Sequence, residues 1–342
     1  MNDSAFPSVY DCHAHYLPER LAAPMRRAIA GKEFAYGLQS PAWDHMDEQI
    51  NQMDACGVAR AGVTYSSFLE GAIDAAGLSR PEGVRLANDE MAEIQARYPD
   101  RIACSAAVDV EANGGMAMEL KRALFDLGLK IVHLSTSYDG LYLDDPRFWP
   151  VYEMAAEKNV PVFVHPALIP AHWEKLMHRS AQGLLLLRGQ VGMIMDTTLC
   201  IGRLAQAGVF DRFPETRFLF CQLGGAIPFL GGRFESNHQM HMDRVKLGEV
   251  PAAQPVPVRL RDYFGRFWLD IHAVDGAAIA CAARQFGVER LVMGTDSPFR
   301  PLRKGLQAPL DNLANSGLSA EEQRRIACDN GRALLGGPAG GR

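Results

Sequence analysis

Eight short apolar runs, separated by stretches of helical pattern, constrain the fold of this chain most strongly. The runs are rich in β-branched and aromatic residues, which is typical of strands buried on both faces of a parallel sheet. They lie at residues 8–12, 59–65, 102–108, 130–134, 161–164, 217–221, 267–271 and 290–293. The helical stretches lie at residues 43–56, 81–98, 115–127, 146–158, 197–207 and 276–286. This alternation predicts a single α/β domain, a (β/α)8 TIM-like barrel over residues 1–335, with a doubly wound open sheet as the competing fold.

Four segments fall outside this alternation. Residues 17–41, after the first strand, are expected to form a cap over the barrel mouth. Residues 167–195 are expected to form a long active-site loop or a subunit-contact arm. The Pro- and Val-rich residues 250–258 suit a surface linker, and the Gly-rich residues 336–342 suit a flexible tail.

Composition narrows the class of protein. The chain has 342 residues, 48% of them hydrophobic and 22% charged, which is ordinary for a globular protein with a substantial core. Its net charge of −5 and the lack of a basic run argue against a nucleic-acid partner. No apolar stretch is long enough to span a bilayer, and residues 1–7 lack a signal-peptide core. Seven cysteines without a C-x-x-C pair suit a reducing compartment, so a cytoplasmic protein is expected.

Histidine and aspartate side chains stand at the ends of three predicted strands. His13 and His15 follow the first strand, His165 ends the fifth and Asp296 ends the last. Side chains two residues apart on an extended backbone point to the same side, so His13 and His15 can reach one ion. In a closed barrel all four converge at one rim, which favours the barrel over an open sheet. Imidazole and carboxylate suit zinc, manganese or iron in a site with an open position for water or substrate.

Motifs that match one known family run through nearly the whole chain. They are Asp11-Cys-His-Ala-His15, Leu143-Asp-Asp-Pro146, Val162-Phe-Val-His-Pro166, Gly208-Val-Phe-Asp-Arg-Phe-Pro214, Leu223-Gly-Gly-Ala-Ile-Pro-Phe229, Gly294-Thr-Asp-Ser-Pro-Phe299 and Asn330. Together they resemble the amidohydrolase superfamily, specifically its decarboxylase-like branch of aminocarboxymuconate semialdehyde and resorcylate decarboxylases.

The resemblance implies a barrel of the metal-dependent hydrolase type, usually a homodimer, that holds one divalent metal ion. The residues that match the family's ligands are His13, His15, His165 and Asp296, with zinc expected first and manganese or iron as alternatives. The implied reaction is nonoxidative decarboxylation, or hydration, of a small aromatic or unsaturated carboxylate.

One residue departs from the family pattern. Relatives carry a histidine before the Gly-Gly pair as an acid/base, and here Gln222 occupies that place. A glutamine does not titrate near neutral pH, so it cannot carry a proton as histidine does. His133 and His272 end the fourth and seventh predicted strands, and either could replace the missing base, as could Asp296. If Gln222, His133 and His272 all faced the metal, a second ion would become conceivable.

Other residues are candidates for substrate binding or for support. Arg233 matches a position where relatives carry an arginine that binds the substrate carboxylate, which suits its guanidinium fork. Trp173 and Phe299 could flank a planar substrate, although single aromatic residues in loops are more often packing residues. Asp11 is expected to orient a histidine from behind it, and Asp296 to act as a ligand, a proton acceptor or both.

The leading hypothesis is a metal-dependent carbon–carbon lyase that decarboxylates a small carboxylate. Hydrolysis or hydration of a small molecule is the nearest alternative, and an iron or manganese redox role is a more remote one. The replacement at Gln222 also motivates a different hypothesis, a weakened subunit that partners an active paralogue. Fold alone does not choose among these functions.

Overall fold

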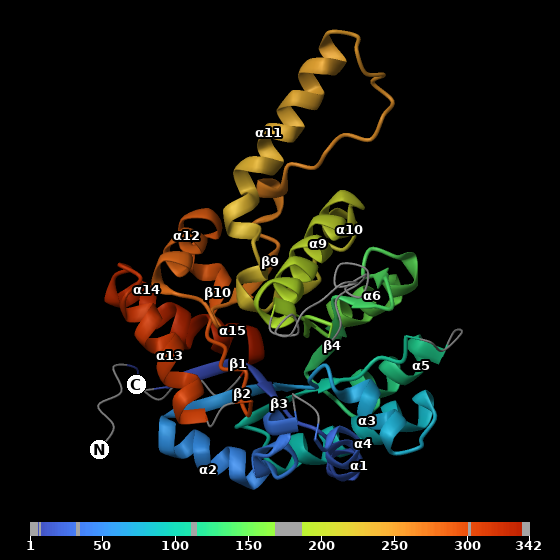
Figure 1. Ribbon diagram of the computed structural model, residues 1–342, viewed down its shortest axis with the longest axis vertical. Coiled ribbons are helices and arrows are strands. Elements are labelled where there is room, and N and C mark those ends of the chain that lie inside the picture. The colour runs from blue at the N-terminus through green and yellow to red at the C-terminus, as the bar shows by residue number, and fades with distance from the viewer. Residues whose placement is uncertain are drawn as a thin grey trace.

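The computed structural model of the chain describes residues 6, 8–31, 35–110, 115–167, 187–299 and 302–336. Eight parallel strands form one sheet surrounded by helices, which confirms the predicted (β/α)8 barrel (Figure 1). In sheet order they are β1 (Val9–His15), β2 (Val58–Thr64), β3 (Ile102–Ala106), β4 (Ile131–Ser135), β7 (Pro161–His165), β8 (Arg217–Phe220), β9 (Phe267–Asp270) and β10 (Leu291–Val292).

The first and last strands join each other, so the sheet closes. The amide of Cys12 donates to the carbonyl oxygen of Met293 at 2.9 Å, and the amide of His15 donates to that of Ser297 at 2.6 Å. Ala14 and Ser297 form a parallel bridge beyond β10. These bonds exclude the open doubly wound sheet, whose first and last strands would be free edges.

Helices lie on the outside of the barrel, and most strand-to-strand connections contain one. They are α1 (Glu19–Ile29), α2 (Met46–Cys56), α3 (Leu69–Ala75), α4 (Arg80–Arg97), α5 (Gly115–Lys121), α6 (Trp149–Glu157), α9 (Met193–Gln206), α10 (Val209–Arg212), α11 (Ile227–Lys246), α12 (Gly276–Phe286), α13 (Leu302–Ala314), α14 (Ala320–Arg324) and α15 (Asn330–Leu335). Local sequence signals fix where several of these helices begin or end. Gly57 ends α2 with a φ of 75°, and Ser79 with Glu82 forms a capping box before α4.

Shorter elements complete the connections. Residues Ser137–Tyr138 (β5) and Leu141–Tyr142 (β6) pair as an antiparallel hairpin after β4. Single turns of 3-10 or π helix are η1 (Ala35–Leu38), η2 (Pro41–Trp43), η3 (Arg122–Asp126), η4 (Pro146–Phe148), η5 (Arg188–Gly192), η6 (Gln222–Gly224), η7 (Leu260–Tyr263), η8 (Val288–Arg290) and η9 (Arg325–Asp329).

The barrel interior is a packed core and not a channel. Ile131, Phe163 and Leu219 from three strands form one buried cluster with Leu334 and Leu335 of the final helix α15. α15 therefore covers the amino-terminal end of the barrel. The buried polar side chains described below lie at the opposite, carboxyl-terminal end.

The segments expected to break the alternation have structure of their own. The predicted cap contains α1, which packs against α3, followed by η1 and η2. In the predicted loop 167–195, residues 187–195 are helical and lead into α9, while residues 168–186 lie outside the described residues. The predicted tail is described only at Gly336. Within the described ranges, no helix has the length and apolar character needed to cross a membrane.

Candidate metal centre

The four side chains predicted as metal ligands meet at the carboxyl-terminal mouth of the barrel. His13 and His15 belong to β1, which runs three residues beyond its predicted end, and His165 is the last residue of β7. The Nε2 atoms of His13 and His15 are 3.1 Å apart, and Oδ1 of Asp296 is 2.9 Å from that of His15 and 3.4 Å from that of His13. One donor atom from each of the four, His165 included, lies within 4.8 Å of the others. Ligands bound about 2.1 Å from one ion are about 3–3.4 Å apart, so this donor set fits a metal.

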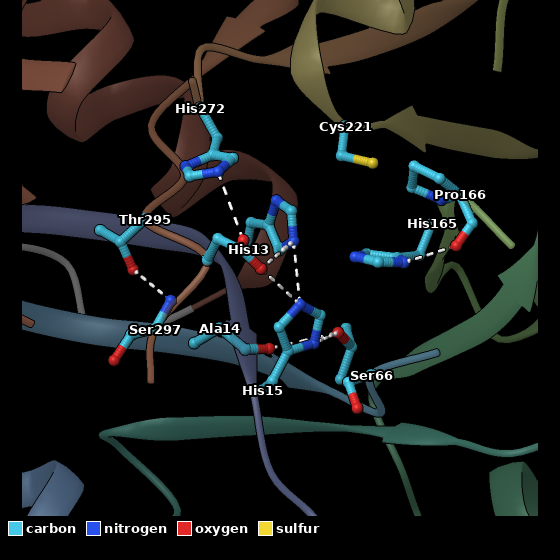
Figure 2. A network of polar contacts seen from close by, with 12 residues as sticks. His13, Ala14, His15, Ser66, His165, Pro166, Cys221, His272, Thr295 and Ser297 are labelled. Atoms are coloured by element: carbon cyan, nitrogen blue, oxygen red, sulfur yellow. Dashed lines mark hydrogen bonds and ion pairs between the residues drawn. The ribbon is translucent and has the colours of Figure 1, made fainter. Parts of the chain in front are cut away.

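Each histidine turns its Nδ1 toward the protein and its Nε2 toward the common centre. Nδ1 of His165 is 2.9 Å from the carbonyl oxygen of Pro166, and Nδ1 of His15 is 3.1 Å from the hydroxyl of Thr64. That hydroxyl donates its one proton to the carbonyl oxygen of Ala14, so it accepts from the His15 ring. Figure 2 shows the rings of His13, His15 and His165 facing a shared region. Partners on Nδ1 fix the tautomer that leaves Nε2 free to bind an ion.

Asp270, at the end of β9, holds three parts of the centre. Its Oδ2 is 2.7 Å from Nδ1 of His13, and its Oδ1 accepts from the amides of Gln222 and His272 at 2.8 and 2.9 Å. The pair needs a glycine beside it, because a Cβ on Gly294 would lie 2.9 Å from Cβ of His13 and 3.0 Å from Cβ of Asp270. Sequence reasoning missed Asp270, although its place at a strand end was the signal used for the ligands.

The electrostatics of the centre follow from burial and from these pairs. Burial alone would lower the pKa of His13, but the Asp270 carboxylate, helped by Asp296, raises it to about 10. Burial lowers the pKa of His15 and of His165. Burial would raise the pKa of Asp296, but His272, His13 and His15 hold it well below its usual range. Without an ion, the centre therefore combines ionised carboxylates with a protonated His13 and neutral His15 and His165, so a bound cation would take the place of the His13 proton.

Asp296 presents its two oxygens to different neighbours. Oδ1 faces His13 and His15, whereas Oδ2 is 3.3 Å from Nε2 of His272. Its backbone has a φ of 58°, a conformation that costs energy in residues other than glycine. The amide of Asp296 donates to the carbonyl oxygen of His13 at 2.8 Å, which holds this conformation in place.

Gln222 and His133 are also placed at this mouth. Gln222 has a φ of 54°, its amide is bound by Asp270, and its side-chain Oε1 is buried without a hydrogen-bond partner among the described residues. The His133 ring lies 6.3 Å from the ring of His165 and its Nδ1 also lacks a partner there. Burial, with His15 and His13 adding to it, lowers the pKa of His133 to about 3. His133 is therefore neutral at ordinary pH.

Asp11 supports the centre from behind. It accepts from the amide of His13 at 3.1 Å and from both the hydroxyl and the amide of Thr295. Burial raises the pKa of Asp11 to about 6. These bonds tie β1 to the end of β10 and leave Asp11 out of the donor set.

Aromatic rings wall one side of the centre. Trp43 stacks on His15 at 6.2 Å between ring centroids, and Phe299 lies 5.9 Å from His15 and 4.8 Å from Trp43. Gln49 holds the same wall by donating to the carbonyl oxygens of His15 and Ala42. Sequence reasoning did not single out Trp43 or Gln49, because neither lies at a strand end.

Of the other two predicted substrate contacts, Arg233 does not lie with the ligands. Arg233 is exposed on α11, the helix that projects from the barrel in Figure 1. Trp173 lies outside the described residues.

Comparison with known proteins identifies the family and several relatives. A model of the family described as Amidohydrolase matches residues 10–337. The chain is 29% identical over 252 residues to a 2-amino-3-carboxymuconate-6-semialdehyde decarboxylase of Dictyostelium discoideum, covering 74% of this chain but only 64% of that enzyme. It is 24% identical over 306 residues to a gamma-resorcylate decarboxylase of Polaromonas sp. strain JS666, covering 87% of this chain and 89% of that enzyme.

A solved structure shows the same fold. The crystal structure of a dihydroxybenzoic acid decarboxylase from Polaromonas sp. JS666, with bound manganese and the inhibitor 2-nitroresorcinol, aligns with a TM-score of 0.78. The alignment covers 96% of this chain and 97% of that one, at 20% sequence identity.

Proposed function

The chain belongs to the amidohydrolase family, and from that premise we propose that it is a metal-dependent decarboxylase of a small aromatic or unsaturated carboxylic acid. The single observation that carries the proposal is the convergence of Nε2 of His13, His15 and His165 with Asp296 at the barrel mouth. Decarboxylase relatives that match along most of this chain supply the reaction class.

We propose one divalent ion, zinc first, with manganese supported by the bound metal of a structural neighbour and iron as a further alternative. When bound, the ion would polarise a substrate oxygen and so favour negative charge there. A second group, His13 with Cys221 and Asp270, also brings donor atoms together. However, Nδ1 of His13 is already bonded to Asp270, and burial raises the pKa of the Cys221 thiol well above its usual value. Both facts favour a single ion.

Decarboxylation of such an acid needs a proton at the carbon that loses the carboxyl group. As that carbon takes up the proton, its bond to the carboxyl carbon breaks, carbon dioxide leaves, and the bonding electrons return to the ring. In the proposal, Nε2 of His272 and Oδ2 of Asp296, 3.3 Å apart, form the pair that supplies the proton. His133, held neutral by burial, acts as a hydrogen-bonding group instead.

Two residues that the sequence analysis singled out, Gln222 and Phe299, are proposed as substrate contacts. The unpartnered Oε1 of Gln222 supports a role in accepting a hydrogen bond from a substrate hydroxyl or amine. Phe299, beside His15, forms an apolar wall for a planar substrate. Trp173 stays proposed as a contact to the ring, whereas the exposed position of Arg233 on α11 argues against its predicted contact with the carboxylate.

Assembly and location complete the proposal. A homodimer is supported by large apolar side chains exposed four residues apart along one face of η5 and α9, namely Leu187, Val191, Met195 and Leu199. A cytoplasmic location is supported by seven cysteines that are all free thiols. A paralogous partner subunit is the alternative assembly if the chain alone proves inactive.

Replacing His165 with alanine tests the proposal. His165→Ala should lower bound metal by at least about tenfold and remove carbon dioxide release from dihydroxybenzoates. His45→Ala, a change at an exposed histidine before α2, is the matched control and should retain both. Metal is measured by elemental analysis of purified protein. Turnover that persists in His165→Ala would overturn the metal-dependent mechanism.

The products distinguish the remaining alternatives. A hydratase or hydrolase would consume substrate and keep every substrate carbon in its products, without releasing carbon dioxide. A redox enzyme would turn over only with an electron donor or acceptor.

A further inference from the structure

A cavity lies at the opposite end of the barrel from the candidate metal centre. It measures about 400 Å³ and is lined by the starts of several strands and by the end of α15. Pro161 lines it at the first residue of β7, while His165 is the last residue of the same strand. Four strand residues span roughly 13 Å, so the two sites are separate.

The described lining of this cavity gathers positive charge. Its lining includes Arg60 of β2, Arg217 at the start of β8, Lys130 just before β4, and Lys158. Among the described residues, no aspartate or glutamate belongs to the lining, although the whole chain carries more acidic than basic residues, 40 against 35. A local excess of this kind is not what the overall composition would produce.

Arg60 is buried in this cavity and forms no ion pair with a described carboxylate, although Asp100 partly offsets the effect of burial from a longer distance. Only 6% of its surface is exposed, and its Nε has no hydrogen-bond partner among the described residues. One Nη atom donates to the carbonyl oxygen of Pro99 at 3.0 Å, a neutral partner. Burial lowers the pKa of this guanidinium. A buried cation with an idle donor is costly to fold unless something compensates it.

Arg217, which lines the same cavity, also has a donor atom without a partner among the described residues. Its Nε is also buried without a partner, and one Nη atom donates to the carbonyl oxygen of Asn159. Burial is the cause that lowers its pKa, and no carboxylate opposes that effect. No ion pair joins Arg60 or Arg217 to an acidic residue of the described part of the chain.

We propose that this amino-terminal cavity binds a small phosphate-bearing anion between Arg60 and Arg217, with Lys130 and Lys158 at its edge. A phosphate group is multiply charged and offers several acceptor oxygens, which suits the two guanidinium and two ammonium groups that line the cavity. A volume of about 400 Å³ leaves room for more than the phosphate itself, as in small-molecule sites generally. This binding is independent of the reaction at the other end of the barrel.

Calorimetric titration of the metal-loaded protein with inorganic phosphate and with glycerol 2-phosphate, at constant ionic strength, tests the proposal. We expect Arg217→Gln to weaken both by at least about tenfold, since a charge-assisted pair is lost. Lys130→Gln, at an exposed position that the fold does not depend on, should weaken them about threefold. Arg27→Gln, at an exposed arginine of α1, is the matched control and should bind as the wild type does.

Thermal unfolding separates a loss of binding from a loss of folding. Without phosphate, Arg217→Gln should unfold near the wild-type Tm or above it, because a partly buried charge without an ion-pair partner has been removed. With phosphate at about 100 times its Kd, the wild type should gain about 4 °C and the variant should not.

Three results would overturn the proposal. One is a Tm gain in phosphate that is equal in wild type and Arg217→Gln, which would place the anion elsewhere, as at the metal centre. Another is the absence of binding in the wild type. The third is succinate binding as tightly as phosphate, which would contradict the assignment of a phosphate group.

Discussion

Asp270 orders the candidate centre through three contacts at once. Its bond to Nδ1 of His13 fixes which nitrogen faces the metal, and its other oxygen anchors the amides of Gln222 and His272. In Asp270→Asn an amide nitrogen facing His13 would favour the other tautomer, so we expect metal affinity to fall about 10–100-fold. The metal-free Tm should fall by several degrees, because the buried pair of Asp270 with His13 loses its charge, although the amide oxygen can keep the two backbone bonds.

Competition with a chelator measures this affinity. Asp126→Asn, at an exposed position before Gly128, is the matched control. Unchanged affinity in Asp270→Asn would show that Asp270 does not position His13.

His272 is the residue on which the proposed proton supply depends. His272→Gln should lower kcat by about 10²–10⁴ while the metal content stays near that of the wild type. His133→Gln is the matched control and should cost less than about tenfold, because the low pKa of His133 keeps it from carrying a proton near neutral pH.

Gln222→His then serves as a rescue of His272→Gln. A histidine restored at the family position should recover part of the lost rate on dihydroxybenzoates. If His133→Gln proves the severe change and His272→Gln the mild one, the proposed proton source is wrong. Inactivity of every form, with a related chain co-purifying, would favour the partner-subunit hypothesis.

Among the elements, α4 supports the end of β1 through a single carboxylate. Oε1 of Glu90 accepts from the hydroxyl of Tyr16 at 3.1 Å and from the amide of Glu19, the first residue of α1, at 2.6 Å. Burial raises the pKa of Glu90. The folded chain therefore binds this proton more tightly than the unfolded chain, and stability falls as the pH rises from the ordinary glutamate range through the raised pKa.

Glu90→Gln keeps an acceptor oxygen and removes that titration. The Tm of Glu90→Gln minus that of the wild type should therefore increase from pH 4 to pH 8, by about 1 °C for a partly exposed group in a chain of this size. Thermal unfolding across this pH range measures the difference. A difference that shrinks as the pH rises would contradict the assignment.

The sequence was informative about elements wherever burial leaves a continuous pattern. The apolar runs located all eight barrel strands, because strands covered on both faces carry few polar residues. It missed α11, a long and mostly polar helix that buries only Ile227, Pro228 and Gly231. The sequence also could not predict residues that act through contacts distant in the chain, such as Asp270 with His13. Spacing rules describe neighbours along the chain and not partners 257 residues apart.

At the scale of the whole molecule, the two ends of the barrel carry opposite chemistry. Three histidines and an aspartate converge at the carboxyl-terminal mouth, and unpaired arginines gather at the amino-terminal end. The packed interior, with Phe163 and Leu219 at its centre, separates them. Removal of a bound metal by a chelator should therefore lower the Tm by a few degrees and leave phosphate binding at the other end unchanged.

The central claim is that metal bound by His13, His15, His165 and Asp296 supports decarboxylation. The most direct measurement is carbon dioxide release from a panel of dihydroxybenzoates by protein whose metal content has been determined. The account predicts about one divalent ion per chain, release of one carbon dioxide per substrate consumed, loss of this activity on chelation, and its return when zinc or manganese is restored. Carbon dioxide release that chelation leaves unchanged, or none from fully metal-loaded protein on any member of the panel, would contradict it.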